Sequence, residues 1–433
     1  MTGRASAQLP RLGRAAYPAR MPNPARVSAR RTFPAVVLVL LIGLVALVLL
    51  WPDAQPSPVT RAAGATPAGG AAKTGAPETG PPPTSPPAYL AWIPGGFLSS
   101  FRDHVRTVDG LSATVVVAGD TRWLTASHDA DGAIVDRPAT SFAIPIDAFA
   151  VNPVEYAPFL PEELRGITIA ALNAGKGILS TRSAELRGVG VGGTLTFGDR
   201  QVTVGAVVPD EAIGWSELLV SRQVGERLGI VDDRYLLAVP DETISERAWG
   251  DLVAGLLPDG TPIRSVAPGG SPYIRVGSGV NPPVVVKGMF GEFGARPDPA
   301  DPVYFSIDPR WVSAHLRTKS LPLIGRVTCN VALLPPLTHA LREIERAGLS
   351  SLIHSTAGCF NARTVARDPT APPSNHSYGA AIDINAPENA YGATPTMDER
   401  IVAIFERWGF AWGGDFLIPD GMHFELGTPP GVG

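Results

Sequence analysis

The chain contains 433 residues, 45% of them hydrophobic, and its formal net charge is −4. This length and apolar content allow two or three folded domains. Residues 1–33 contain seven arginines and no acidic residue, so this segment carries +7 and the remaining residues carry −11. The acidic balance of the remainder excludes nucleic acid as an expected partner. Because residues 1–33 are also rich in proline and alanine, we expect a disordered basic tail there.

A continuous hydrophobic run follows the basic tail. Residues 35–51 contain no polar side chain, and as a helix they would extend roughly 26 Å, slightly less than a bilayer core of about 30 Å. We therefore predict a transmembrane helix at residues 34–52. The arginines before it and Asp53 after it place the basic tail in the cytoplasm and the rest outside, as in a single-pass protein of the cell membrane. A cleaved signal peptide is the alternative, although no small-x-small cleavage site directly follows.

An extended linker and an accessory domain are expected next. Residues 53–88 are mostly proline, alanine, glycine and threonine, a composition typical of a linker. Residues 89–284 show mainly strand patterns, followed by shorter stretches with helical spacing, and together these predict a β-rich α+β domain. The patterns are a β-branched run at 113–118, a hairpin at 193–204 with its turn at Gly198-Asp199, and helices at 216–228 and 245–257.

The accessory domain carries no recognisable catalytic motif. His104 and His128 are isolated in the sequence, and a lone histidine does not predict a metal site. Residues 190–208 faintly resemble the extracytoplasmic domains of transporter permeases. This resemblance implies at most a role in binding or positioning.

Residues 285–433 are predicted to form a second α+β domain, built on a small antiparallel sheet. Residues 336–347 have the spacing of an amphipathic helix that ends at Gly348. A capping box at 396–399 predicts a second helix that ends at Gly409. These two helices are expected to support a site on the segments around them.

Two short motifs carry the residues expected to perform chemistry. Residues 374–383 read Ser-x-His-x-x-Gly-x-Ala-x-Asp, and residues 420–423 read Asp-x-x-His. The two imidazoles and the carboxylate of His376, His423 and Asp383 match the ligand set of a catalytic Zn²⁺, whose fourth position stays open for water. On one straight strand His376 and Asp383 would point to opposite faces, so we expect a bend or bulge at Gly379. Asp420 would lie near the metal as the general base for the zinc-bound water.

The two motifs resemble those of the LAS metallopeptidases, which include zinc D-alanyl-D-alanine carboxypeptidases of vancomycin resistance and L-alanyl-D-glutamate peptidases of phage endolysins. The likeness covers residues 287–426 and includes 358–363 and 408–415. It implies that His376, Asp383 and His423 bind zinc and that Asp420 is the base. It also implies that Arg363 holds a substrate carbonyl or carboxylate. The dipeptidase branch uses Glu as its base, so Asp420 argues against a free dipeptide as substrate.

Several residues near the motifs are expected to support the site. Ser374 and Tyr378 are expected to stabilise the metal loop by hydrogen bonding or to touch substrate, and Glu425 to contact a metal ligand from behind. Trp412 is expected to line the cleft or to pack in the core. Cys329 and Cys359 are expected to form a disulfide, which closes a loop of about thirty residues and contributes on the order of 3–4 kcal/mol.

These features predict a membrane-anchored zinc metallopeptidase that hydrolyses a peptide bond in the peptidoglycan stem peptide. D,D-carboxypeptidase and L-alanyl-D-glutamate endopeptidase activity both remain open, because no residue distinguishes them. The alternative from another class is a catalytically silent, zinc-containing module that binds peptidoglycan. The sequence does not predict the oligomeric state or a partner of the accessory domain.

Overall fold

The computed structural model describes residues 88–268, 280–368 and 371–427, all of which fall within one compact unit, Glu78–Gly433. The predicted tail, the predicted membrane helix and nearly all of the predicted linker lie outside the described residues. Among the described residues, no helix is long and apolar enough to cross a membrane. The predicted single-pass membrane localisation is therefore corrected, because no described element supports it.

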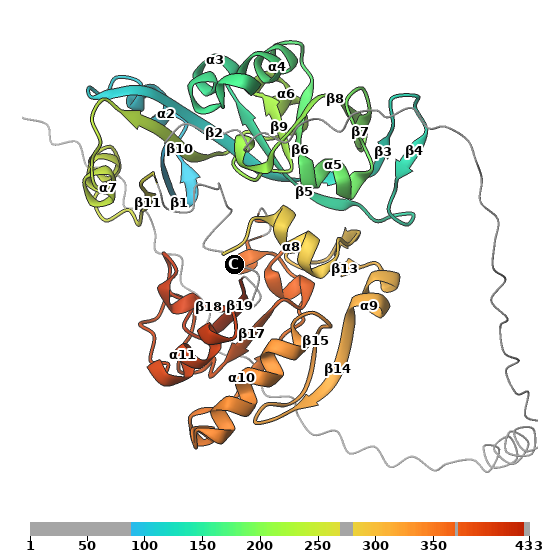
Figure 1. Cartoon of the computed structure of the whole chain (residues 1–433), viewed down its shortest axis with the longest axis vertical. Helices are drawn as coiled ribbons and strands as arrows, with labels where there is room; N and C mark the ends of the chain where they lie inside the picture. The colour runs from blue at the N-terminus through green and yellow to red at the C-terminus, as the bar shows by residue number, and fades with distance from the viewer. Residues whose placement is uncertain (1–87, 269–279, 369–370, 428–433) are drawn as a thin grey trace, which may run out of the picture. The chain divides into compact units, whose positions relative to one another are not determined.

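The first half of the described chain is built on one large mixed sheet (Figure 1), with strand order β11-β1-β10-β2-β5-β9-β6-β8-β7-β3-β4. Neighbouring strands are antiparallel except for two parallel pairs, β5–β9 and β6–β8. The strands are β1 (Tyr89–Phe97), β2 (Leu111–Leu124), β3 (Ala126–His128), β4 (Ile134–Asp136), β5 (Ile144–Val151), β6 (Gly177–Ser180), β7 (Thr194–Phe197), β8 (Arg200–Val208), β9 (Leu218–Ser221), β10 (Asp233–Pro240) and β11 (Arg264–Val266). We call residues 88–268 the large-sheet region.

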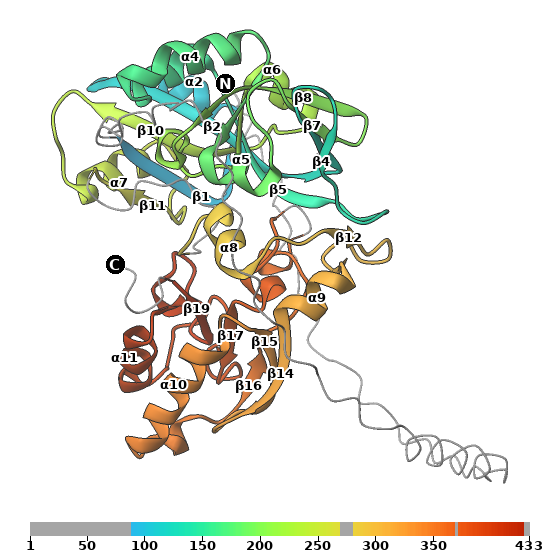
Figure 2. The ribbon, with the colours of Figure 1, turned by 45° about the vertical axis from the view of Figure 1, so that its right-hand side comes forward.

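Helices cover both faces of the large sheet (Figure 2). They are α2 (Phe101–Val105), α3 (Pro153–Tyr156), α4 (Glu162–Asn173), α5 (Thr181–Arg187), α6 (Arg222–Leu228) and α7 (Glu246–Ala254), with short 3-10 turns at Ala157–Phe159 and Asp210–Ile213. Helices α3 and α4 pack with Val115 and Val117 on one face. Helices α6 and α7 pack on the other face, where Ala118 and Val116 point. The alternation along β2 thus buries both faces of its central segment.

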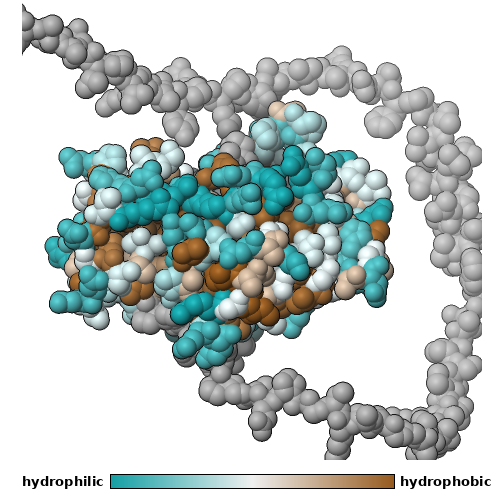
Figure 3. All heavy atoms as spheres, turned by 90° about the horizontal axis from the view of Figure 1, so that it is seen from above, coloured by the Kyte–Doolittle hydropathy of each residue, from teal (hydrophilic) through white to brown (hydrophobic). Residues whose placement is uncertain are grey.

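The surface over α3 and α4 is mixed. Figure 3 looks from above onto the end of the molecule where Figure 1 shows these helices, and hydrophilic and hydrophobic residues are interspersed there. The exposed hydrophobic side chains include Val154 and Ile167, which are 74% and 55% exposed. Single exposed hydrophobic residues of this kind are normal on a protein surface and define no docking site.

The second half of the described chain, residues 280–427, we call the C-terminal region. Its four-stranded sheet has the order β16-β17-β19-β18 and is antiparallel throughout, as predicted for the small sheet. The helices are α8 (Pro283–Phe290), α9 (Pro309–His315), α10 (Leu334–Arg346) and α11 (Glu399–Arg407). The strands are β12 (Ala295–Pro297), β13 (Phe305–Ile307), β14 (Leu316–Leu321), β15 (Gly325–Asn330), β16 (Thr356–Gly358), β17 (Ala381–Ile384), β18 (Phe410–Trp412) and β19 (His423–Leu426). The 3-10 turns are η3 (Ser350–Leu352), η4 (Val365–Arg367), η5 (Asn375–Tyr378) and η6 (Gly413–Asp415).

Helices α10 and α11 pack against the small sheet and form the core beneath the site. Leu337, Leu341 and Ile344 of α10 are fully buried, as their helical spacing predicts. Phe405 of α11 stacks on Phe424 of β19 with ring centroids 4.3 Å apart. The rings of this contact fix β19 against the helix layer.

The disulfide predicted between Cys329 and Cys359 is confirmed, with Cα atoms 5.0 Å apart. It joins β15 to the residue that directly follows β16. Both cysteines are buried in the core of the C-terminal region. The bond therefore fixes the loop that leaves the small sheet next to the predicted metal motif.

Two predicted helix boundaries are wrong. The segment expected as one helix at 216–228 is the strand β9 followed by α6. The capping box predicted at 396–399 does not start α11 at Thr396. The N-cap is Asp398, whose side chain accepts a hydrogen bond from the backbone N–H of Arg400.

A buried ion cluster connects the large-sheet region with α8. Lys287 of α8 donates from Nζ to both carboxylate oxygens of Glu217, at 2.7 and 2.8 Å. Arg187 of α5 contacts the same carboxylate at 2.5 Å and also pairs with Glu292. The side chains of Lys287, Arg187 and Glu217 are at most 1% exposed. Breaking such a buried pair leaves an uncompensated charge, so the cluster holds α8 in place. The predicted division between residues 284 and 285 remains a prediction.

Candidate metal centre

The first metal motif folds as a short 3-10 turn that leads into a strand. His376 lies on η5, and the Ser374 side chain caps this turn by accepting a hydrogen bond from the His376 N–H at 3.3 Å. Gly379 ends the turn at φ +64°, and a Cβ at this position would lie 2.7 Å from the backbone nitrogen of Asn330. Glycine is therefore required here. The reversal predicted at Gly379 is present, but a left-handed turn end produces it rather than a bulge.

The other two predicted ligands lie on neighbouring strands. Asp383 of β17 is directly opposite His423 of β19 in the antiparallel register. Side chains opposite each other in such a pair project from the same face of the sheet. The sheet thus brings together two residues that are forty positions apart in the chain.

The three predicted ligands converge on one point. One ligand atom from each of His376, Asp383 and His423 lies within 4.8 Å of the others. His376 Nε2 is 3.0 Å from Asp383 Oδ1, and His423 Nδ1 is 3.2 Å from the same oxygen. All three residues are at most 8% exposed. A buried set of two imidazoles and one carboxylate matches a three-ligand catalytic zinc site.

The second nitrogen of each histidine ring already has a partner. His376 Nδ1 lies 2.9 Å from the backbone oxygen of Cys359, and His423 Nε2 lies 3.2 Å from Glu425 Oε2. If these nitrogens carry the proton, the lone pairs of His376 Nε2 and His423 Nδ1 face the shared point. Outer acceptors that fix the tautomer in this way are typical of metal-binding histidines. The donor set therefore fits Zn²⁺.

The charges of the cluster favour a cation at its centre. Burial opposes ionisation of Asp383, but His376 and His423 outweigh it and hold the pKa of this carboxyl well below its usual value. Burial also acts against a charged His423, yet its hydrogen bonds to Asp383 and Glu425 raise the pKa of this ring to about 10. Asp383 is consequently ionised at neutral pH. The two carboxylates around His423 stabilise positive charge at this position.

Asp420 lies in a tight turn directly before β19. The backbone oxygen of Asp420 accepts from the His423 N–H at 2.9 Å, and its own N–H donates to Gly413 at 2.8 Å. Burial raises the pKa of Asp420, and the Asp383 charge acts in the same direction, whereas His423 opposes both. Its buried Oδ1 accepts no hydrogen bond from the described residues. Asp420 thus combines electrostatic contact with the candidate ligands and an acceptor oxygen that is still available.

Close packing of the backbone holds this turn against the site. A Cβ on Gly413 would lie 2.6 Å from the Asp420 backbone oxygen and 3.0 Å from the Cβ of His423. Glycine at this position lets η6 approach the turn that carries Asp420. The requirement comes from close approach rather than from an unusual backbone angle.

Arg363 lies beside the first motif. Its N–H donates to Ser377 Oγ at 3.1 Å, and its Nη1 donates to the Thr364 carbonyl at 3.1 Å. Burial lowers the pKa of this guanidinium, while the charge of Asp383 acts to raise it. Its buried Nε has no acceptor among the described residues. The guanidinium therefore retains donor capacity close to the candidate ligands.

The remaining predicted site residues have different surroundings. Glu425 contacts His423 as expected and also accepts from Asn375 Nδ2 at 2.5 Å. Trp412 donates to the Gly421 carbonyl at 2.9 Å and lines a cavity of about 210 Å³ with Phe416. Tyr378 is 4% exposed, and its ring lies 4.5 Å from that of Phe293. Its carbonyl oxygen accepts from Asn330 Nδ2 at 3.0 Å, and the predicted support of the metal loop by its side chain remains a prediction.

Three contributors to the site were not predicted from the sequence. The Cys359 carbonyl orients His376, Asn375 orients Glu425, and the Phe416 ring lies 6.0 Å from that of His423. Asn375 falls inside the first motif, so the sequence offered a reason to expect it at the site. The Cys359 carbonyl belongs to the backbone and has no signal in the sequence.

Comparison with known proteins supports a peptidase. Residues 367–426 match the model of a family described as D-alanyl-D-alanine carboxypeptidase. This segment contains the three candidate ligands and Asp420, whereas Arg363 and both cysteines lie before it. Among curated proteins, no sequence matches this chain.

Solved structures with some likeness to the chain include two transporter domains. The periplasmic region of MacB from Actinobacillus actinomycetemcomitans is 8% identical, with a TM-score of 0.28, and the match covers 42% of this chain and 88% of that one. The extracellular domain of the noncanonic ABC-type transporter YknZ from Gram-positive bacteria is 14% identical, with a TM-score of 0.26, and the match covers 39% and 95%. Scores this low support no conclusion about this chain, so the resemblance predicted for residues 190–208 remains a prediction.

Proposed function

We propose that the C-terminal region is a zinc metallopeptidase domain that hydrolyses a peptide bond in peptidoglycan stem peptides. The observation that carries this proposal is the convergence of His376, Asp383 and His423 within 4.8 Å, inside the segment that matches a D-alanyl-D-alanine carboxypeptidase family. The available carboxylate of Asp420 supports turnover rather than binding alone, because hydrolysis requires a proton acceptor near the metal.

Each residue has a defined role in this proposal. His376, Asp383 and His423 hold the metal, which when bound supplies a Lewis acid and lowers the pKa of water. Asp420 accepts a proton from the attacking water and transfers it to the leaving amine nitrogen. Arg363 donates hydrogen bonds to a substrate carbonyl or carboxylate, for which its planar fork is suited.

The products would identify the bond that is cleaved. A D,D-carboxypeptidase releases free D-alanine from intact stem peptides. An L-alanyl-D-glutamate endopeptidase instead releases a peptide that begins with D-glutamate. Mass spectrometry of purified muropeptides, incubated with the zinc-loaded chain, distinguishes these two activities.

The same assay contains its own control. We expect fragments with the zinc-loaded chain and none after chelation, with activity restored when zinc is added back. A zinc-loaded chain that retains peptidoglycan but releases no fragment would instead favour the binding module.

A further inference from the structure

A second candidate site lies in the large-sheet region, at the carboxyl ends of the parallel strands β5 and β9. These strands are adjacent, with Val151 paired to Ser221 at their ends. Helix α3 leaves β5 toward one face of the sheet, and α6 leaves β9 toward the other. In open mixed sheets, ligands bind in the crevice outside the carboxyl ends of strands whose connections diverge in this way.

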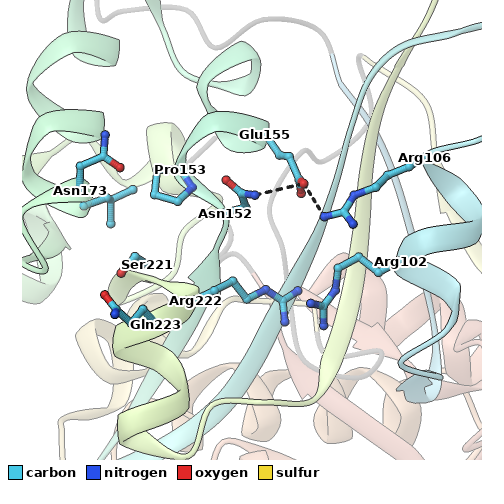
Figure 4. Close-up of a pocket in the computed structure, with 10 residues that line it drawn as sticks. Arg102, Arg106, Asn152, Pro153, Glu155, Asn173, Ser221, Arg222 and Gln223 are labelled. Carbon is cyan, nitrogen blue, oxygen red and sulfur yellow. Dashed lines mark hydrogen bonds and ion pairs between the residues drawn. The ribbon is translucent and has the colours of Figure 1, made fainter.

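A cavity of about 350 Å³ occupies this position. It is at the lower end of the range of about 300–1,000 Å³ that is common for small-molecule sites. Three arginines line it: Arg102 of α2, Arg106 at the C-cap of α2, and Arg222 of α6. The lining side chains Asn152, Asn173 and Gln223 add amide groups (Figure 4).

The arginines are held with part of their donor capacity unused. Asp233 bridges two of them, at 2.8 Å from Arg102 Nη2 and 2.6 Å from Arg222 Nη2. The Asp233 side chain is 3% exposed, whereas those of Arg102 and Arg222 are 31% and 16% exposed. No described residue accepts from Arg102 Nη1 or from Arg222 Nε and Nη1. The buried carboxylate therefore orients two guanidinium forks and leaves some of their donors free.

The residues that line this cavity include three arginines and one carboxylate, Glu155. Figure 4 shows the guanidinium groups of Arg102 and Arg222 next to each other, and Arg106 in contact with Glu155. Three carboxylates pair with these arginines, Asp233 with Arg102 and Arg222, and Glu155 and Asp103 with Arg106. Of the three carboxylates, only Glu155 lines the cavity. Burial lowers the pKa of Arg222 and the adjacent Arg102 charge acts in the same direction, although Asp233 opposes them. A bound anion would relieve this repulsion.

We propose that this cavity binds a small organic anion through a carboxylate or phosphate group, which is held between Arg102, Arg106 and Arg222. Carboxylates and phosphates share the paired oxygens that guanidinium forks recognise. The amides of Asn173 and Gln223 would contact the polar remainder of the ligand. This site is separate from the candidate metal centre, and it does not depend on the proposed peptidase activity.

Calorimetric titration of the full chain with sodium phosphate, and separately with sodium succinate, tests the proposal. Sodium chloride keeps the ionic strength constant, because exposed charges respond to salt alone. We expect saturable binding of at least one of the two anions. Phosphate binding alone identifies a phosphate ligand, and succinate binding alone identifies a carboxylate ligand.

Three variants locate the site. Arg222→Lys retains the charge but loses the fork, and Arg106→Gln removes a charge from a side chain that is 43% exposed. Each should weaken binding by about tenfold or more, the loss typical of one charge-assisted contact. Arg247→Gln is the control, because this arginine lies on α7 and is 92% exposed.

Unliganded melting temperatures show whether each variant is folded, and Arg106→Gln carries the test if Arg222→Lys unfolds. The proposal is overturned if neither anion binds the wild-type chain saturably. It is also overturned if folded Arg106→Gln binds both anions as tightly as wild type does.

Discussion

His376 and His423 each direct one ring nitrogen to the candidate metal centre and the other to an acceptor. For His423 that acceptor is Glu425, two residues further along β19, and for His376 it is the carbonyl of Cys359, seventeen residues earlier in the chain. The first contact could be expected from strand alternation. The second depends on how the loop after β16 folds, and no side-chain pattern encodes it.

A substitution at Asp420 tests metal binding and catalysis separately. We predict that Asp420→Asn retains about one zinc per chain, because all three candidate ligands remain. Its turnover of peptidoglycan peptides should fall by roughly 10² to 10⁴, since the variant keeps the size but loses the proton acceptor. Zinc content and fragment release are measured on the same sample.

Glu345→Gln is the matched control for this prediction, because Glu345 is exposed on α10. It should behave as wild type in both measurements. If Asp420→Asn turns over at the wild-type rate, Asp420 is not the base, and Glu425 becomes the next candidate.

A substitution of a candidate zinc ligand should lower zinc content as well as activity. His423→Ala removes one of three candidate protein ligands, so zinc content and activity should fall together. Metal analysis after dialysis measures the zinc content, and fragment release measures the activity. His354→Ala is the control, because this histidine is 53% exposed and pairs with Glu388 away from the candidate ligands. Full zinc retention by His423→Ala would remove this residue from the ligand set.

At the scale of elements, the disulfide fixes the loop that carries the Cys359 carbonyl. Replacing both cysteines by serine should lower the free energy of unfolding by about 3–4 kcal/mol in the chain-entropy model. Because that carbonyl orients His376, zinc affinity should fall as well. Denaturant unfolding and zinc titration measure the two effects. Unchanged values for both would show that the bond does not support the site.

The stability of the fold should depend on pH through Asp147, whose backbone N–H donates to Glu217 of the buried ion cluster. Asp147 of β5 is 3% exposed, neither carboxylate oxygen has a partner among the described residues, and burial together with Glu217 raises its pKa well above the usual value. The unfolded chain therefore ionises this group at lower pH than the folded chain does, so the group destabilises the fold increasingly as pH rises above about 4.

Asp147→Asn should consequently stabilise the chain by at least about 1 kcal/mol, and the gain should be larger at pH 8 than at pH 5. Thermal unfolding at the two pH values measures this difference. Asp131→Asn, at an exposed position, is the control. A gain that is equal at both pH values would mean that Asp147 does not titrate as described.

Local sequence patterns predicted a helix correctly where residues close in sequence determine the structure. The buried spacing of Leu337, Leu341 and Ile344 marked α10 correctly. Residues 216–228 were predicted wrongly, because Leu218–Ser221 pairs with β5 and β6, and these strands are distant in sequence. Four apolar or small residues followed by a short helix have nearly the spacing of one longer helix. Long-range pairing decided the structure there.

For the candidate site, the sequence predicted which residues come together but not all of their contacts. His376, Asp383 and His423 are close together, as their residue types and motifs predicted. Tyr378 belongs to the same motif, yet its ring packs against Phe293 of a distant loop. The two motifs thus predicted which residues come close together, but not what the Tyr378 ring contacts.

At the scale of the whole molecule, the candidate metal centre and the anion cavity lie in different parts of the described chain. Every residue assigned to the metal centre comes from positions 359–425, and every residue of the anion cavity comes from positions 102–233. Their tests are therefore independent. The buried cluster around Glu217 and Lys287 connects the large-sheet region to α8.

We propose that one zinc ion, held by His376, Asp383 and His423, is required for hydrolysis of peptidoglycan peptides. Titration of the metal-free chain with zinc, with fragment release recorded by mass spectrometry at each step, tests it most directly. We expect activity to rise in proportion to added zinc and to saturate at about one ion per chain. Fragment release by the metal-free chain, or no release at one zinc per chain, would contradict it.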